Sequence, residues 1–169
     1  MSHLHIALVR QKYNAAGGAE RFVSRAIQAL AEDGAQITLL TRQWEKLEGM
    51  QAVQIDPFYV GNVWRDASFA GAVCKAQRGL HFDLVQSHER LACCDVYRAG
   101  DGVHREWLAQ RRRVLSPLGR LSLLANPYHH YVQAAEARMF ASPRLKTVIC
   151  NSRMVKAEIQ RYFGLPDEK

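Results

Sequence analysis

The chain has 169 residues, a length that fits one domain of ordinary size. Hydrophobic residues make up 48% and charged residues 23%, proportions that exclude a disordered or collagen-like chain. The formal net charge is +7, with 17 arginines against 6 lysines, and this balance favours a partner that carries phosphate groups.

Apolar runs in the sequence are short. None approaches the roughly 18 residues that a membrane-spanning helix needs, and the N-terminus passes into its first apolar run without the pattern of a secretory leader. We therefore expect a cytoplasmic protein.

The first elements alternate between strand and helix. Residues 5–9 form a short apolar run typical of a buried parallel strand, and a loop then leads into a helix with apolar residues at spacings of three and four. Gly34 ends that helix, and residues 36–41 form a second strand rich in apolar residues. This order predicts a β-α-β unit with a parallel crossover.

The same alternation continues to the end of the chain. The pattern predicts strands at 52–55, 82–87, 96–99 and 147–150, and helices at 63–78, at about 127–140, and after Ser152 up to Gly164. Residues 105–120 are basic and are expected to be irregular. The fold class predicted is α/β, a Rossmann-like parallel sheet with helices on both faces, in a single domain over 1–169.

Candidate binding residues follow the predicted strands, because ligands of an open parallel sheet sit beyond the carboxyl ends of its strands. The candidates are Gly17, Gly18, Glu20 and Arg21 after the first strand, His88 after the fourth, Asp101 and His104 after the fifth, and Asn151 and Ser152 after the last. We expect them to converge on one cleft.

Gly17 and Gly18 stand immediately before a helix, where free amides and the helix dipole suit a phosphate or a sugar hydroxyl. The segment matches neither the GxGxxG fingerprint nor the P-loop. A tight turn is the alternative interpretation, with Glu20 opposing the helix dipole and Arg21 in solvent.

Asp101 lies between two glycines, which gives its carboxylate close access to a ligand whose hydroxyl proton it could accept. His104 is an alternative base or an orienting partner, and a simple Asp-Gly turn is the other interpretation. His88 could bind an acceptor hydroxyl or a phosphate, or could be a polar residue at a strand end.

Metal and disulfide chemistry are not expected. There is no HExxH or Asp-x-Asp motif, and His129 and His130 would lie on different helix faces. The four cysteines form no CxxC pair, so reduced thiols are expected.

A basic segment over 105–120 combines apolar residues with arginines, the candidate contacts being Arg105, Arg111, Arg112 and Arg113. Such a mixture fits an anionic membrane surface or the phosphates of a large substrate. A solvated helix face is the alternative. Only the positive charge supports binding to nucleic acid, since no nucleic-acid-binding motif is present.

Several motifs resemble a known family. The segments 17–21 (GGAER), 83–88 (DLVQSH) and 148–152 (VICNS) resemble the N-terminal domain of family-four retaining glycosyltransferases of the GT-B fold. The segments 95–101 (DVYRAGD) and 128–136 (YHHYVQAAE) resemble bacterial lipopolysaccharide core α-glucosyltransferases more closely. The resemblance covers nearly the whole chain.

This resemblance implies the acceptor-binding half of an enzyme that transfers a sugar, with retention, from a nucleotide-sugar, expected to be a UDP-sugar, to lipopolysaccharide core or a similar cell-envelope glycan. No cofactor and no obligate metal are implied. It places Gly17 and Gly18 beside the donor phosphates and acceptor, and the catalytic Asp101 under the transferred sugar or at the acceptor hydroxyl. A location at the inner face of the inner membrane is expected.

The donor-binding C-terminal domain of such enzymes has no counterpart in the sequence, so we expect this chain alone to be inactive. Two other classes of function remain open for this chain. One is a stand-alone module that binds an anionic glycan, and the other is a nucleic-acid-binding module whose affinity falls steeply with salt.

Overall fold

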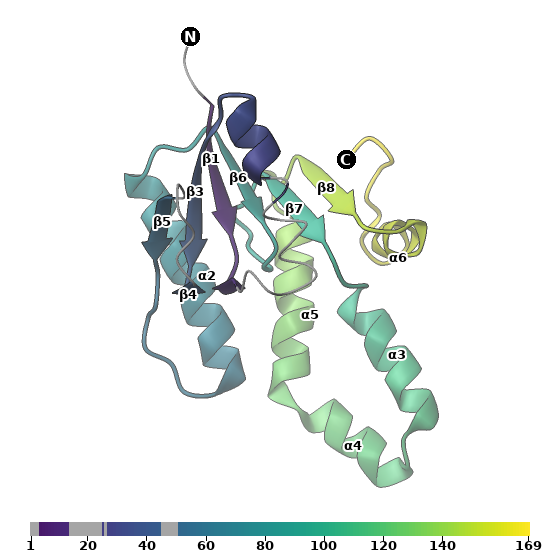
Figure 1. Ribbon diagram of the computed structural model, residues 1–169. Coiled ribbons are helices and arrows are strands. Elements are labelled where there is room, and N and C mark those ends of the chain that lie inside the picture. Colours follow the sequence, from purple (N-terminus) through teal and green to yellow (C-terminus); the bar gives the residue numbers. More distant parts are fainter. Residues whose placement is uncertain (1–3, 14–24, 26, 45–50) are drawn as a thin grey trace. The chain divides into compact units, whose positions relative to one another are not determined.

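The computed structural model describes residues 4–13, 25, 27–44 and 51–169. The chain divides into two compact units, residues 1–89 and residues 90–169. Figure 1 labels the elements of both. Each unit is described by itself.

The first unit is built on parallel strands. They are β1 (His5–Val9), β3 (Gln36–Thr41), β5 (Gln51–Gln54) and β6 (Leu84–Ser87). Their order is β5-β3-β1-β6, with Ile6 of β1 paired to Ile37 on one side and to Leu84 on the other. Two short strands, β2 (Lys12–Tyr13) and β4 (Gln43–Trp44), pair with each other in parallel.

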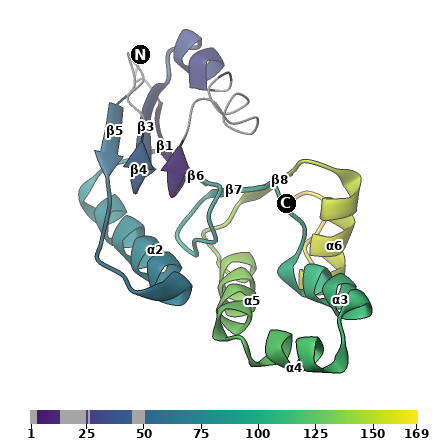
Figure 2. The ribbon, with the colours of Figure 1, turned by 60° about the horizontal axis from the view of Figure 1, so that its bottom comes forward.

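Helices cover both faces of these strands, as predicted from the apolar runs. Residues 27–32 are helical, and Ile27 packs on the cluster formed by Leu8, Ile37 and Leu39. The helix α2 (Gly61–Gly79) lies on the other side of the strands in Figure 2. It buries Phe69 and Val73 completely. The burial of β1 on both faces explains why its sequence is a continuous apolar run.

The second unit has two parallel strands and four helices. The strands β7 (Val96–Ala99) and β8 (Thr147–Cys150) pair in register from Val96 opposite Thr147. The helices are α3 (His104–Val114), α4 (Pro117–Ala125), α5 (Pro127–Phe140) and α6 (Arg153–Phe163). Figure 2 shows α3, α4 and α5 following one another, with α4 joining the far ends of the other two.

The core of the second unit lies under α5 and α6. Its buried members include Val132, Ala135, Met139, Val155 and Ile159. The ring of Phe140 packs edge-on against Tyr97 of β7, with centroids 5.8 Å apart, and lies 4.4 Å from the ring of Phe163 in α6. Aromatic contacts of this kind fix the two helices on the strand pair.

The expectation of an irregular segment at 105–120 is wrong, because α3 and α4 occupy it. Only Leu108 of α3 is buried and no residue of α4 is. Apolar residues of these two helices, such as Leu118 and Leu121, are exposed and lie among clustered arginines, so they do not indicate a helix that packs on a core. The local signals were capping residues: Ser116 precedes Pro117, and its hydroxyl accepts a hydrogen bond from the Gly119 amide at 3.3 Å.

Two further features concern cysteines and membrane helices. Cys94 and Cys150 carry free thiols, whereas Cys74 and Cys93 are disulfide-bonded, so the expectation of reduced cysteines is wrong for two of the four. That expectation came from the assumed compartment and not from geometry. Within the described parts of the chain, no helix has the length and apolar character needed to cross a membrane.

Candidate functional site

An open cavity of about 1090 Å³ lies in the second unit, beyond the carboxyl ends of β7 and β8. It brings together four of the residues predicted from sequence: Asp101, His104, Asn151 and Ser152. Asp101 is exposed to solvent between Gly100 and Gly102. The prediction that the loops after these two strands meet in one cleft is therefore confirmed for this part of the chain.

Hydrogen bonds tie the two loops together. The side-chain amide of Asn151 donates to the carbonyl of Gly100 at 2.5 Å, and the Asn151 backbone amide donates to the carbonyl of Ala99 at 3.3 Å. Ser152 caps α6 by accepting from the Val155 amide at 3.2 Å. Asn151 and Ser152 thus fix the rim of the cavity around Asp101.

Gly102 is closely approached by the Glu158 side chain. The Glu158 carboxylate accepts a hydrogen bond from the Val103 amide at 2.9 Å, which links α6 to the start of α3. A Cβ atom on residue 102 would lie 2.6 Å from Oε2 of Glu158. The absence of a side chain at residue 102, next to Asp101 in the chain, leaves room for the Glu158 carboxylate.

Glu136 of α5 holds the beginning of α3 in place, and it was not among the residues predicted from sequence. Its side chain is buried, and Oε1 accepts from Nε of Arg90 at 3.0 Å. Both of its carboxylate oxygens accept from the His104 amide at 3.2 Å. Burial raises the pKa of Glu136, while the Arg90 guanidinium opposes that rise.

His104 and His129 face each other across α3 and α5, with Nε2 of His104 3.0 Å from Nδ1 of His129. Burial, the Arg90 charge and His129 lower the pKa of His104 to about 4. Burial and His130 lower the pKa of His129. His104 is therefore uncharged at neutral pH and acts there as a hydrogen-bonding group.

The separate faces expected for His129 and His130 are confirmed. His129 lies against His104, whereas Nε2 of His130 is 2.6 Å from the carbonyl of Leu124. Among the described residues, no group of three or more histidine, cysteine, aspartate or glutamate side chains could hold a metal ion.

The other predicted residues lie elsewhere. Gly17, Gly18, Glu20 and Arg21 fall outside the described residues. His88 belongs to the first unit, where its backbone amide donates to the carbonyl of Val9 at 3.1 Å. The arginines of the basic segment, Arg105, Arg111, Arg112 and Arg113, are exposed along α3.

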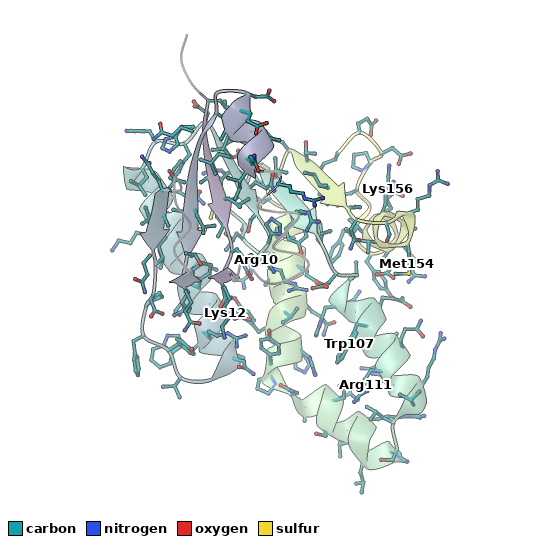
Figure 3. The ribbon with its side chains drawn as sticks, in the orientation of Figure 1. Arg10, Lys12, Trp107, Arg111, Met154 and Lys156 are labelled. Atoms are coloured by element: carbon teal, nitrogen blue, oxygen red, sulfur yellow. The ribbon has the colours of Figure 1, made fainter. Side chains whose placement is uncertain are left out.

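Two residues of α3 add features that the sequence analysis did not single out. Trp107 and Glu106 both line the cavity. Figure 3 labels Trp107 and, one helical turn further on, Arg111. Glu106 forms an ion pair with Arg161 of α6 and accepts from the hydroxyl of Tyr162 at 2.9 Å. The three-residue spacing of Trp107 from His104 along one helix was the available signal for Trp107, and Glu106, two residues from His104, had none.

Comparisons with known proteins give a curated relative, a solved structure and a family model. A probable transglycosylase of Burkholderia thailandensis is 24% identical over 157 residues, which cover 90% of this chain and 40% of that protein. The crystal structure of WaaG, a glycosyltransferase involved in lipopolysaccharide biosynthesis, matches with a TM-score of 0.81 at 22% identity. That match covers 96% of this chain and 43% of WaaG, so the chain spans about two fifths of either relative.

The likeness to WaaG confirms the fold class, an α/β Rossmann-like fold of the kind found in the N-terminal half of a GT-B glycosyltransferase. The family model named Glycosyltransferase Family 4 matches residues 16–169, which is nearly the whole chain. The chain belongs to glycosyltransferase family 4.

Proposed function

We propose that this chain is the acceptor-binding N-terminal domain of a retaining glycosyltransferase. The enzyme transfers a sugar from a nucleotide-sugar, a UDP-sugar in our proposal, to lipopolysaccharide core or a similar cell-envelope glycan. The observation that carries the proposal is the exposed carboxylate of Asp101 on a large open cavity at the carboxyl ends of β7 and β8. Family membership and the likeness to WaaG support it.

The surroundings of Asp101 support a role as an acceptor-side carboxylate. It is exposed, its neighbours are glycines, and the rim beside it is fixed by Asn151. In the proposed reaction, Asp101 accepts a hydrogen bond from the acceptor hydroxyl or lies beneath the transferred sugar. The departing donor phosphate helps remove the acceptor proton, and neither a metal nor a cofactor is needed. Gly17 and Gly18 would border the donor phosphates and the acceptor.

A membrane-facing role is proposed for α3 and α4. The arginines at 111, 112 and 113 are exposed, and so are four apolar side chains on the same pair of helices: Val114, Leu118, Leu121 and Leu124. Exposed apolar residues next to clustered arginines suit the interface of an anionic bilayer. We propose that the enzyme works at the inner face of the inner membrane, where its lipid-linked acceptor would lie.

A three-way titration tests the proposed function against its alternatives. The chain is titrated by calorimetry with lipopolysaccharide core oligosaccharide, UDP-glucose and a DNA duplex, each at two salt concentrations. An acceptor domain is expected to bind the core oligosaccharide most tightly and UDP-glucose weakly, because the donor nucleotide is held mainly by the second domain. Preferred binding to DNA, with affinity falling steeply as salt rises, would contradict the proposal.

A glycan-binding module without catalysis is expected to show the same binding preferences in this titration as an acceptor domain. Measuring turnover distinguishes the two. The complete protein that contains this chain, supplied with UDP-glucose and core oligosaccharide, is expected to release UDP only when both substrates are present. Binding of the oligosaccharide without any release of UDP would favour the non-catalytic module.

A further inference from the structure

Trp107 is a fixed aromatic surface in the cavity. Its side chain is 49% exposed and lines the cavity beside His104. The His104 ring stacks on it, with centroids 5.5 Å apart and planes inclined by 16°, and the His129 ring lies 5.6 Å away. The hydrogen bond between the two histidines, at 3.0 Å, completes a cluster of three rings. A ring held in this way loses little freedom when a ligand packs against it.

Both guanidinium groups of the cavity lining are already paired with carboxylates. Arg90 is bonded to the buried carboxylate of Glu136 at 3.0 Å, and Arg161 is paired with Glu106. His104 adds no charge at neutral pH, since its pKa is lowered to about 4. The carboxylates of Asp101 and Glu158 add negative charge to the same lining. The charged side chains of the described lining therefore offer a phosphate or another anion no unpaired cation and two further carboxylates.

An uncharged sugar ring matches both properties of the lining. One face of a pyranose ring is made of C–H groups, which pack on the flat face of an indole, while its hydroxyls donate hydrogen bonds to carboxylates. Pockets of this type combine an apolar contact surface with a few polar groups that fix orientation.

We propose that Trp107 is the stacking platform for an uncharged sugar unit of the acceptor, whose hydroxyls donate hydrogen bonds to Asp101 and Glu158. The assignment to the acceptor rests on the proposed function, whereas the sugar site itself rests on the cavity. The negative groups of the acceptor lie outside this cavity.

A matched pair of tryptophans makes the inference testable. Trp64 of α2 is also 49% exposed but lies in the first unit. The indole N–H signals of the ¹⁵N-labelled chain are followed by NMR during titration with methyl α-D-glucopyranoside, glucose 6-phosphate and inorganic phosphate. The backbone amide signals of Gly102 and Glu158, which also line the cavity, report binding in the variants that lack Trp107. Trp107→Leu keeps an apolar side chain against the histidines and removes the flat face, and Trp64→Leu is its control.

In the wild-type chain the methyl glucoside is expected to shift the Trp107 indole signal in a saturable way, with the Trp64 signal unmoved. Trp107→Leu is expected to weaken this binding by about tenfold, and Trp107→Phe by less, since stacking is partly kept. Trp64→Leu leaves the affinity within about twofold. Glucose 6-phosphate binds more weakly than the methyl glucoside, and inorganic phosphate does not shift the Trp107 signal.

Equal affinity of Trp107→Leu and the wild type for the methyl glucoside would overturn the proposal. So would tighter binding of glucose 6-phosphate than of the uncharged sugar. Sugar transfer by the complete protein separates this failure from failure of the proposed function. If the complete protein transfers sugar and Trp107→Leu leaves the KM for the acceptor unchanged, the proposed function stands and the proposed role of Trp107 is contradicted. If the glucoside binds in a way that depends on Trp107 but no sugar is transferred, the role of Trp107 stands and the proposed function is contradicted.

Discussion

The backbone amide of His104 donates to both carboxylate oxygens of Glu136, at 3.2 Å each. The same carboxylate accepts from Arg90 at 3.0 Å. The buried carboxylate of Glu136 on α5 therefore accepts hydrogen bonds both from the first residue of α3 and from a guanidinium group of the cavity lining. The start of α3, which carries His104 and Trp107, depends on this carboxylate.

Replacing Glu136 should therefore destabilise the fold. Glu136→Ala is expected to lower the free energy of unfolding by about 2–3 kcal/mol, because it leaves the Arg90 guanidinium and the His104 amide without their acceptor. Glu136→Gln keeps one carbonyl acceptor and should cost about 1 kcal/mol. Urea unfolding followed by circular dichroism measures both, with the exposed Glu168→Ala as control. A value for Glu136→Ala within about 0.5 kcal/mol of the wild type would contradict this account.

The stability of the chain should depend on pH through His104. Its pKa is about 4 in the folded chain, below the ordinary value of about 6.5 that applies when the chain is unfolded. The unfolded state therefore binds more protons between these values, so stability is full above about pH 6.5 and falls as the pH drops toward 4.

Urea unfolding at pH 7.5, 5.5 and 4.5 measures this dependence. His104→Asn removes the titrating ring and should flatten the fall, whereas His81→Asn replaces an exposed histidine of the first unit and should leave it unchanged. If the slope of stability against pH is the same in His104→Asn as in the wild type, His104 is not the group responsible.

Gly102→Ala tests the close approach of Glu158. The added Cβ would lie 2.6 Å from Glu158 Oε2, so the carboxylate must move and its hydrogen bond to the Val103 amide is lost. A cost of about 1 kcal/mol in unfolding free energy is expected. Gly100→Ala is the control, because a Cβ added at residue 100 would lie 3.9 Å from the Arg98 guanidinium, which is an ordinary van der Waals contact. Equal costs for the two variants would show that Gly102 has no special role.

Anionic vesicles test the proposed membrane contact of α3. Vesicles that contain phosphatidylglycerol should co-sediment with the chain, and replacing Arg111, Arg112 and Arg113 together by glutamine should weaken binding by roughly a hundredfold. Replacing the exposed Arg78, Arg138 and Arg153 removes the same charge elsewhere and should have a much smaller effect. Co-sedimentation that is indifferent to lipid charge, or equal losses in both triple variants, would contradict the membrane contact.

The sequence was sufficient for the elements with a clear local pattern. The strands 36–41 and 147–150 have the predicted limits, and the helix capped by Ser152 begins at Arg153 and ends before Gly164, whose φ is +64°. Burial agrees with local chemistry for 36–41 and for the helix, whereas no residue of 147–150 is buried and that strand was recognised from its β-branched residues. The helices α3 and α4 were missed because clustered arginines lie among their apolar residues, a mixture that does not indicate a core-facing helix, and only one residue of the two helices is buried.

The candidate site was predictable only where residues follow strands. Asp101, Asn151 and Ser152 were found because parallel strands bring their carboxyl ends together. Glu136 and Glu158 lie within helices, where a glutamate is usually a solvated residue, and their contacts join residues 32 and 55 positions apart. Contacts of that range depend on tertiary packing, as does the buried Arg42, which bonds Asp56 at 2.6 Å in the first unit.

The role of Asp101 is tested most directly by turnover. In the complete protein that contains this chain, transfer from UDP-glucose to lipopolysaccharide core is measured for the wild type, Asp101→Ala and the exposed control Asp33→Ala. The account predicts a kcat at least about a hundredfold lower for Asp101→Ala, with the control unchanged. Wild-type kcat in a correctly folded Asp101→Ala enzyme would remove Asp101 from the reaction.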